Sequence, residues 1–369
     1  MQLPVNPPIL PMLAKRVSAL PTGEEFVYEP KWDGFRALVF RDGDELFIQS
    51  RDEKPLARYF PELVSALSAA LPPRVVLDGE IVIARNDVLD FDALQMRLHP
   101  AASRVELLSR EIPASVVFFD VLAEGDRDLR DVPFAERRKR LEALLSGAKP
   151  PIHLTPATAE RAVAEDWFRR FEGAGLDGVM AKPLSGVYAP NKRVMFKVKH
   201  ERDCDCVVAG FRWHKNGRNE AVGSLLLGLY DDARGLAFVG VCASFTMAKR
   251  RELVEFLAPY RERARENHPW KEWADAGSEG GERRKPGGQS RWSQGKDLSW
   301  EPLRVELVVE VAYDHMQSGR FRHTAQFRRF RDDKKPSDCT FEQLEVVPPE
   351  ELANIFRGGR RGPNPGSDP

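Results

Sequence analysis

The sequence contains little cysteine and no long hydrophobic run. Its 369 residues include four cysteines, Cys204, Cys206, Cys242 and Cys339, and their spacing contains no C-x-x-C pair of the kind that a structural zinc site requires. We expect reduced thiols, with Cys204 and Cys206 on the same face of a strand. No apolar run approaches the roughly 18 residues that span a bilayer, and the N-terminus lacks the basic and apolar regions of a signal peptide. These absences predict a cytoplasmic protein that does not contact a membrane.

An excess of charge is also lacking. The chain has 56 basic and 56 acidic residues, so its formal net charge is zero. A protein of this composition has no overall positive field that would attract nucleic acid. Any polyanion must therefore be bound by local basic patches. The length and the 42% hydrophobic content are sufficient for two domains that each bury a core.

Two blocks of different pattern meet near residue 200. In residues 1–200, strand-like segments rich in Val, Ile and Phe alternate with helical patterns, which predicts a mixed α/β domain. In residues 201–345, several short strand patterns accompany one helical pattern, which favours a small barrel of the oligonucleotide-binding (OB) type. The predicted fold class is therefore α+β.

Residues 262–299 and 346–369 differ from both blocks. The first segment is rich in glycine and charge and contains Trp270, Trp273 and Trp292. Its composition favours a flexible surface insertion; the alternative is a DNA-contacting loop that uses arginine for phosphate and tryptophan for base stacking. Residues 346–369 are predicted to be a disordered tail.

The segment from Glu29 to Arg36, with the sequence EPKWDGFR, contains a candidate nucleophile. A free lysine has a pKa of about 10.4, so few lysines carry a lone pair at neutral pH. Neighbouring cations and partial exclusion of water lower that pKa, and the amine can then attack phosphorus. Arg36 supplies such a cation, and Gly34 allows the backbone to approach a phosphate closely. Taken alone, the same pattern could be a solvated turn between strands.

Six further segments follow Lys31 in order. They are Ser50-Arg51, Leu77 to Val82 with the triplet Asp78-Gly79-Glu80, Phe118 to Leu122, Leu176 to Lys182, Arg193 to Lys199, and Arg328 to Lys335. The series resembles the ordered motifs of covalent nucleotidyltransferases, and the chain resembles the bacterial ATP-dependent DNA ligases of the C type over residues 8–345. The specificity of the resemblance lies in the series, since each piece alone has an ordinary structural explanation.

The resemblance implies an adenylyltransferase domain of ATP-grasp-like mixed α/β architecture followed by an OB-fold domain. It implies that Lys31 attacks the α-phosphorus of ATP and that Mg²⁺ or Mn²⁺ assists. Glu80 and Asp177 are the candidate metal ligands, and Asp177 replaces a more usual glutamate. The residues expected to bind ATP are Glu29, Arg36, Arg51, Glu80, Phe119, Arg193, Lys197, Lys199, Arg331 and Lys334. Glu29 is expected to recognise adenine, and Phe119 to stack on it.

The implied partner is nicked duplex DNA, and the implied setting is DNA repair, with repair proteins as possible partners of a monomeric enzyme. The nearest alternatives are an RNA ligase and a capping guanylyltransferase. A noncatalytic nucleic-acid binding module would leave the ordered motifs unexplained. An NAD-dependent ligase is disfavoured because the sequence has no N-terminal nicotinamide-binding segment and no paired-cysteine zinc spacing.

Overall fold

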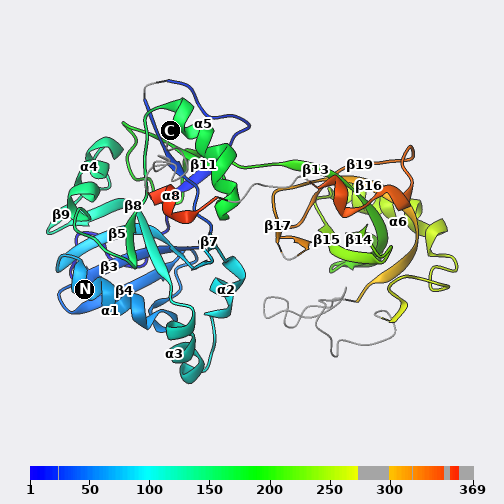
Figure 1. The fold of residues 1–369 in the computed structure, drawn as a ribbon, viewed down its shortest axis with the longest axis horizontal. Helices are drawn as coiled ribbons and strands as arrows, with labels where there is room; N and C mark the ends of the chain where they lie inside the picture. The colour runs from blue at the N-terminus through cyan, green and yellow to red at the C-terminus, as the bar shows by residue number, and fades with distance from the viewer. Residues whose placement is uncertain (24, 273–298, 318, 345–349, 357–369) are drawn as a thin grey trace, which may run out of the picture. The chain divides into compact units, whose positions relative to one another are not determined.

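The computed structural model describes residues 1–23, 25–272, 299–317, 319–344 and 350–356. The chain divides into two compact units, of which the first comprises Met1–Lys199 with Val347–Pro369, and the second comprises His200–Val346 (Figure 1). The boundary between Lys199 and His200 lies where the sequence pattern changes. Among the described residues, no helix is long and apolar enough to cross a lipid bilayer.

A six-stranded sheet forms the larger layer of the first unit, with the strand order β10-β8-β5-β3-β4 and with β9 paired to β8. The strands are β3 (Phe35–Asp42), β4 (Glu45–Ser50), β5 (Arg74–Val82), β8 (Ser115–Glu124), β9 (Arg127–Asp128) and β10 (Ile152–Leu154). Both faces of this sheet are buried, because alternate residues of one strand enter different cores. Leu77 packs in one hydrophobic cluster and its neighbour Val76 in another.

Helices cover the sheet of the first unit. They are α1 (Pro61–Ala70), α2 (Phe91–Met96), α3 (Ala102–Glu111), α4 (Phe134–Leu144) and α5 (Arg161–Arg170). The sequence pattern over residues 56–71 predicts an amphipathic helix that Pro61 either interrupts or begins, and α1 begins at Pro61. Proline is tolerated at the first helical position because its missing N–H would have no intrahelical partner there. The preceding residues Ala57–Tyr59 instead form the short 3₁₀ helix η1.

A four-stranded sheet forms the second layer of the first unit, with the order β1-β12-β11-β2. Its strands are β1 (Leu13–Arg16), β2 (Phe26–Pro30), β11 (Val179–Pro183) and β12 (Arg193–Val198). The first unit also contains the short hairpin strands β6 (Ala84–Arg85) and β7 (Val88–Leu89) and the 3₁₀ helix η2 (Phe171–Ala174). Lys31 follows β2 directly, so the edge of this sheet positions the candidate nucleophile.

The second unit is built on a five-stranded antiparallel sheet with the order β15-β14-β13-β16-β19. Its elements are β13 (Arg202–His214), β14 (Gly217–Tyr230), β15 (Leu236–Cys242), α6 (Met247–Arg261), β16 (Glu301–Tyr313), β17 (Met316–Gln317), β18 (Arg320–Phe321), β19 (Gln326–Phe330), η3 (Pro336–Asp338) and η4 (Phe341–Gln343). A β-bridge between Cys242 and Ala325 links the end of β15 to the start of β19. Five strands closing toward a barrel around a hydrophobic core confirm the predicted OB fold.

Two expectations for the second unit can be compared with its core. The Sγ atoms of Cys204 and Cys206 lie 3.7 Å apart, so these thiols share a face of β13 as predicted. Trp270 does not suit a DNA-stacking role, because its side chain is only 1% exposed and its indole N–H donates a 2.7 Å hydrogen bond to the Leu236 carbonyl. A tryptophan that packs and donates in this way is a core residue. Trp273 and Trp292 lie outside the described residues.

The prediction of a disordered tail is wrong for residues 350–356. Residues Leu352–Phe356 form helix α8, which lies against the first unit (Figure 1). Leu352 and Ile355 are buried there, and this burial supplies the hydrophobic contribution that a short helix needs in order to be stable. The sequence pattern did not reveal this helix because only one turn of apolar residues carries it.

Candidate active site

Lys31 lies directly after β2, in the short segment that connects β2 of the four-stranded sheet to β3 of the six-stranded sheet. Its backbone N–H donates to the Gly178 carbonyl at 2.9 Å, and its carbonyl accepts from the Asp177 N–H at 3.0 Å. The Lys31 Nζ forms an ion pair with Asp177 Oδ2 at 2.6 Å, and the Lys199 Nζ reaches the same oxygen at 2.7 Å. The structure therefore brings together three predicted site residues from three separate motifs.

Asp177 is held as a carboxylate by its two lysine partners. Burial alone would raise its pKa, but Lys31 and Lys199 outweigh burial and hold the pKa well below the usual range. The Asp177 side chain is only 9% exposed, so these ion pairs are weakly screened by solvent. The carboxylate fixes the direction of the Lys31 side chain.

Lys197 adds a third cation to this cluster. Burial, and then Lys31, Lys199 and Arg51, lower the pKa of Lys197 to about 8. Like charges this close repel one another, and a bound polyanion would relieve the repulsion. The cluster of Lys31, Lys197, Lys199 and Arg51 is therefore suited to phosphate, and we call it the lysine cluster.

The low pKa of Lys197 predicts how ATP affinity depends on pH. Lys197 is charged below about pH 8 and loses its proton above it, so the attraction for phosphate is present below this pH and declines above it. We expect the KM for ATP in AMP attachment to rise severalfold between about pH 7 and pH 9. The measurement is the rate of AMP attachment against ATP concentration at each pH.

Lys197→Arg is the matched variant for that measurement, because a guanidinium keeps its charge across this pH range. The rise in KM should be much smaller in this variant than in the wild-type chain. An equal rise in both proteins would assign the titration to another group or to ATP itself.

The Arg36 guanidinium lies over the Phe119 ring. The Arg36 guanidinium donates to both carboxylate oxygens of Asp78, at 2.5 and 2.6 Å, and Tyr188 donates to Asp78 at 2.6 Å. Burial would lower the pKa of Arg36, but Asp78 more than offsets it and holds the pKa above its usual value. The Arg36 guanidinium is thus paired with Asp78. The sequence suggested Arg36 as a cation that lowers the pKa of Lys31, and it did not indicate this ion pair.

The Phe119 ring is only 9% exposed and is bordered by two cations. The Arg36 Cζ lies 4.6 Å from the ring centroid and the Lys182 Nζ lies 4.7 Å from it. Cations at this distance are attracted to the ring face. These two contacts fix the orientation of the Phe119 ring.

Glu29 is buried and held by two basic side chains. Its carboxylate forms ion pairs with Lys182 Nζ at 2.7 Å and with Arg138 Nη1 at 3.2 Å. Lys182 also donates to the Phe119 carbonyl at 3.1 Å, which joins the Glu29 and Phe119 positions. The sequence analysis gave no role to Lys182 or Arg138. Lys182 is the last residue of the motif Leu176 to Lys182, so the sequence could have indicated a role for it. Arg138 lies on α4, and no sequence motif includes it.

Glu80 is the carboxylate best placed to receive a metal ion. Its Oε1 accepts a 3.2 Å hydrogen bond from the Gly34 N–H, and burial raises its pKa to about 7, partly offset by Arg36 and Lys31. Mg²⁺ is commonly held by one or two carboxylates together with substrate phosphates. No group of three or more His, Cys, Asp or Glu side chains suited to a metal occurs among the described residues. Glu80 fits this pattern, and Asp177 fits it less directly because two lysines already hold its carboxylate.

Arg193 does not join the lysine cluster through any described contact. It lies at the exposed start of β12, where its Nη1 donates to the Ala14 carbonyl at 3.1 Å. Lys199 directly follows the end of this strand at Val198, and the role of Arg193 in ATP binding stays a prediction.

In the second unit, Arg331 and Lys334 share one acidic partner. Asp205 Oδ2 accepts from the Lys334 Nζ at 2.7 Å, and Asp205 Oδ1 pairs with Arg331 Nη1 at 3.2 Å. Gln343 holds the backbone of Asp205 by accepting from its N–H at 2.7 Å and donating to its carbonyl at 3.0 Å. Asp205 lies more than a hundred residues before Arg331 in the sequence, so no local pattern pointed to this arrangement.

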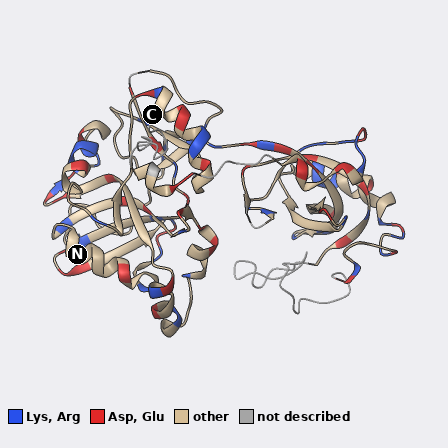
Figure 2. Ribbon diagram, viewed as in Figure 1, with Lys and Arg blue, Asp and Glu red and all other residues tan. Residues whose placement is uncertain are grey.

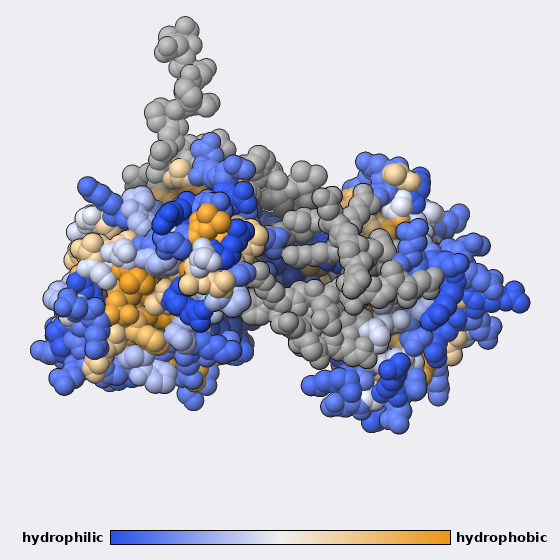
Figure 3. Space-filling view, turned by 90° about the horizontal axis from the view of Figure 1, so that it is seen from below, coloured by the Kyte–Doolittle hydropathy of each residue, from blue (hydrophilic) through white to orange (hydrophobic). Residues whose placement is uncertain are grey.

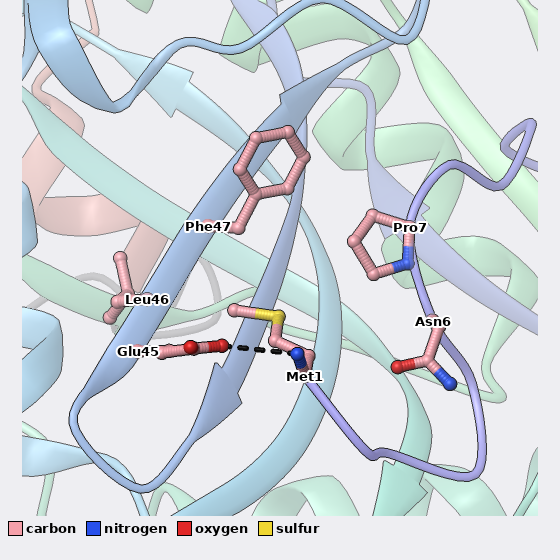
Figure 4. Close-up of a pocket in the computed structure, with 6 residues that line it drawn as sticks. All are labelled: Met1, Asn6, Pro7, Glu45, Leu46 and Phe47. Atoms are coloured by element: carbon pink, nitrogen blue, oxygen red, sulfur yellow. Dashed lines mark ion pairs between the residues drawn. The ribbon is translucent and has the colours of Figure 1, made fainter.

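Charges of both signs are spread over both units (Figure 2), so the basic groups described above are local clusters. A surface hollow of about 470 Å³ lies elsewhere, lined by Met1, Asn6, Pro7, Glu45, Leu46 and Phe47 (Figure 4). The N-terminal ammonium pairs with Glu45 there at 3.1 Å. None of the predicted site residues lines this hollow. Figure 3 shows hydrophobic residues at the surface of the first unit among hydrophilic neighbours.

Comparison with known proteins identifies the family of the chain. Residues 11–199 match the family described as ATP dependent DNA ligase domain, and residues 218–334 match the ATP dependent DNA ligase C terminal region. The chain is 56% identical over 352 residues to DNA ligase C2 of Mycolicibacterium smegmatis, which covers 94% of this chain and 97% of that protein. It is 54% identical over 364 residues to DNA ligase C of Mycobacterium tuberculosis, with coverages of 98% and 100%.

A solved structure shares the fold. It comes from a study titled "DNA binding with a minimal scaffold: Structure-function analysis of Lig E DNA ligases", and it aligns with a TM-score of 0.53 at 19% identity, covering 88% of this chain and 100% of that one. The family matches define the chain as a nucleotidyltransferase of the ligase class. The chain belongs to the ATP-dependent DNA ligase family, and within it to the bacterial C type. The prediction of an ATP-dependent DNA ligase is confirmed.

Proposed function

We propose that the chain seals nicks in duplex DNA through an AMP group carried on Lys31. The observation that carries the proposal is the Lys31 amine, fixed by Asp177 at 2.6 Å among the cations of the lysine cluster. In the first step, the Lys31 ammonium releases a proton to solvent, the resulting amine attacks the α-phosphorus of ATP, a phosphorus–nitrogen bond forms, pyrophosphate leaves, and the nitrogen loses a further proton to solvent. Positioning and charge neutralisation supply most of the catalysis in such a transfer.

The next two steps return the enzyme to its starting state. A 5′-phosphate oxygen of the nick attacks the phosphorus of the lysine–AMP bond, that bond breaks, and Lys31 regains a proton. The 3′-hydroxyl then attacks the 5′-phosphorus, AMP leaves, and the hydroxyl proton is released as the strand closes. Lys197, Lys199 and Arg51 are suited to hold the phosphate oxygens in these steps because they form one basic cluster.

The nucleotide would lie between the lysine cluster and the buried side chains of Glu29 and Phe119. Phe119 would stack on adenine, and Glu29, joined to Phe119 through Lys182, would contact the base edge. A divalent cation, Mg²⁺ or Mn²⁺, would be held by Glu80 and, less directly, by Asp177. Bound there, it would neutralise charge on the triphosphate and make pyrophosphate a better leaving group.

Arg331 and Lys334 would act on the β- and γ-phosphates during the first step. This role is supported by the ion pairs that both residues form with Asp205, whose side chain is 11% exposed. Asp205 thereby holds the two cations next to each other. Arg193, which instead contacts Ala14, would reach the nucleotide only after leaving this hydrogen bond. We also propose that the enzyme acts as a monomer in the cytoplasm and on DNA breaks that other repair proteins prepare.

The direct test of the proposal is incubation of the purified chain with α-labelled ATP or GTP and Mg²⁺, followed by denaturation. We expect AMP label that survives denaturation, and subsequent sealing of nicked DNA in preference to nicked RNA. GMP label would favour a capping enzyme. Mass spectrometry of the untreated protein identifies chains that were purified already carrying AMP, so absence of both label and bound AMP would overturn the proposal.

Replacing both Arg331 and Lys334 with alanine should impair AMP attachment about a hundredfold. Sealing of a nick that already carries AMP should fall much less, because pyrophosphate is absent from that step. The two rates are measured with labelled ATP and with a synthetic adenylated nick.

The matched control for this double variant is the pair Arg329→Ala and Lys335→Ala. These residues carry the same charge in the same segment, but both are exposed, and Arg329 pairs with Glu310 at 2.9 Å. The control should leave AMP attachment nearly unchanged. An equal loss of both steps in the Arg331 and Lys334 variant would indicate a general DNA-binding role instead.

A further inference from the structure

Residues 350–356 return to the first unit after the chain has passed through the second unit. We call them the C-terminal anchor. Its contacts are of several kinds: Glu350 pairs with Arg170 at 3.0 Å, the Leu352 N–H donates to the Asp87 carbonyl at 2.9 Å, and Ile355 is fully buried. An ion pair, a backbone hydrogen bond and a buried apolar side chain within one helical turn define a specific docked position.

The last residue of the anchor, Phe356, packs against two aromatic rings, those of Trp32 and His153. Phe356 is stacked on His153 with 4.3 Å between ring centroids and on Trp32 with 5.2 Å between them, and both pairs are within 23° of parallel. Trp32 is the residue that follows Lys31. Aromatic pairs of this geometry each contribute about 0.5–1.5 kcal/mol beyond their buried area.

A continuous set of hydrogen bonds runs from this stack to the predicted adenine pocket. The Trp32 indole N–H donates to Thr155 Oγ1 at 2.8 Å, and Arg138 donates to the Thr155 carbonyl at 2.8 Å. Arg138 also holds Glu29 at 3.2 Å. All of these groups are buried, so each would be costly to leave without a partner.

Thr155 has a second link to the same pocket. Its backbone N–H donates to the Phe118 carbonyl at 2.9 Å, one residue before Phe119. The ring of Trp32 therefore supports both groups proposed to hold adenine, Glu29 through Arg138 and Phe119 through the strand β8.

We infer that the C-terminal anchor is a positioning element of the nucleotide site and that Phe356 sets the affinity for ATP by holding Trp32 in place. The inference rests on the proposed function. Phe356 is a positioning residue, since its contacts are with Trp32 and His153. The catalytic lysine cluster itself does not include the anchor, so the anchor acts on nucleotide binding more than on the chemistry of sealing.

The test is Phe356→Ala in the full chain. We expect the KM for ATP in AMP attachment to rise about tenfold, with a small change in the maximal rate and with sealing of a pre-adenylated nick retained. Phe356→Trp, which keeps a stacking ring, should restore the KM. A role limited to stability would lower both steps together and would not depend on an aromatic ring at this position.

The matched control is Phe47→Ala. Phe47 is also half-buried, but it packs in a different hydrophobic cluster on β4. This variant should leave the KM for ATP unchanged. If Phe356→Ala yields too little folded protein, Phe356→Leu keeps the apolar contact and removes only the stacking, and the KM should still rise. An unchanged KM in the folded Phe356 variants would overturn the inference.

Equilibrium binding separates this inference from the proposed function. Calorimetry with ATP on Lys31→Ala measures affinity without AMP attachment, and adding Phe356→Ala to that chain should weaken ATP binding by the same factor of about ten. Absence of both AMP label and bound AMP on the wild-type chain would defeat the proposed function alone. Equal ATP affinity of the single and double variants would defeat the role of the anchor alone.

Discussion

Lys31→Ala is expected to abolish AMP attachment and the sealing of an ordinary nick. The variant lacks the amine that forms the phosphorus–nitrogen bond, so the rate of AMP attachment should fall by more than about ten-thousandfold. Sealing of a pre-adenylated nick should persist, because that step joins the 3′-hydroxyl to a phosphate that is already activated. The measurements are label retained after denaturation and the yield of sealed strand.

Two further variants test whether the loss of AMP attachment is due to the missing Lys31 amine. Lys31→Arg keeps a cation beside Asp177 but provides no nucleophile near neutral pH, so it should lose AMP attachment as completely as the alanine variant. Lys139→Ala removes an exposed lysine from α4 and should behave as the wild-type chain. Full ligation by either Lys31 variant would show that another group carries AMP.

Gly178→Ala is expected to have the second largest effect, on both stability and AMP attachment. Gly178 has a φ of +134°, which alanine rarely adopts, and a Cβ built there would overlap the carbonyl oxygen of Val198. The same residue accepts the hydrogen bond from the Lys31 N–H at 2.9 Å. The variant should lose about 2 kcal/mol or more in the free energy of unfolding, together with most of its AMP attachment.

Gly147→Ala is the control for that substitution. A Cβ at Gly147 meets no atom within 4 Å, and the residue is exposed after α4. Its stability should change by less than about 1 kcal/mol, and AMP attachment should remain. Urea unfolding and the labelling assay measure the two effects. A Gly178→Ala chain with unchanged unfolding would mean that the backbone can move away from Val198 at little cost.

The sequence was sufficient to predict the elements that local residue patterns control. Residue patterns predicted the mixture of strands and helices in residues 1–200 and the strand-rich character of residues 201–345, since side chains facing a core recur at the period of the element. Proline decided where α1 begins, although the pattern alone had placed the start earlier. The ordered motifs predicted the enzyme class because their order along the chain is itself sequence information.

Contacts between distant segments were not predictable in the same way. Arg36 carries its charge to Asp78, Glu29 is held by Arg138, and Asp205 holds Arg331 and Lys334. Each pair joins residues that lie far apart in the sequence, and no local pattern indicates which charged residues meet. Trp270 shows the converse case, because composition suggested a surface loop while the indole completes the OB core.

By itself, the sequence determined the type of protein: a nucleophilic lysine with glycine behind it, followed by the motifs of a DNA ligase in a fixed order. The tertiary structure decided how those residues are held. It placed Asp177 between Lys31 and Lys199, and it docked residues 350–356 beside Trp32. The physical reason is that burial and ion pairing depend on which segments meet in space, whereas residue type and local period depend only on the chain.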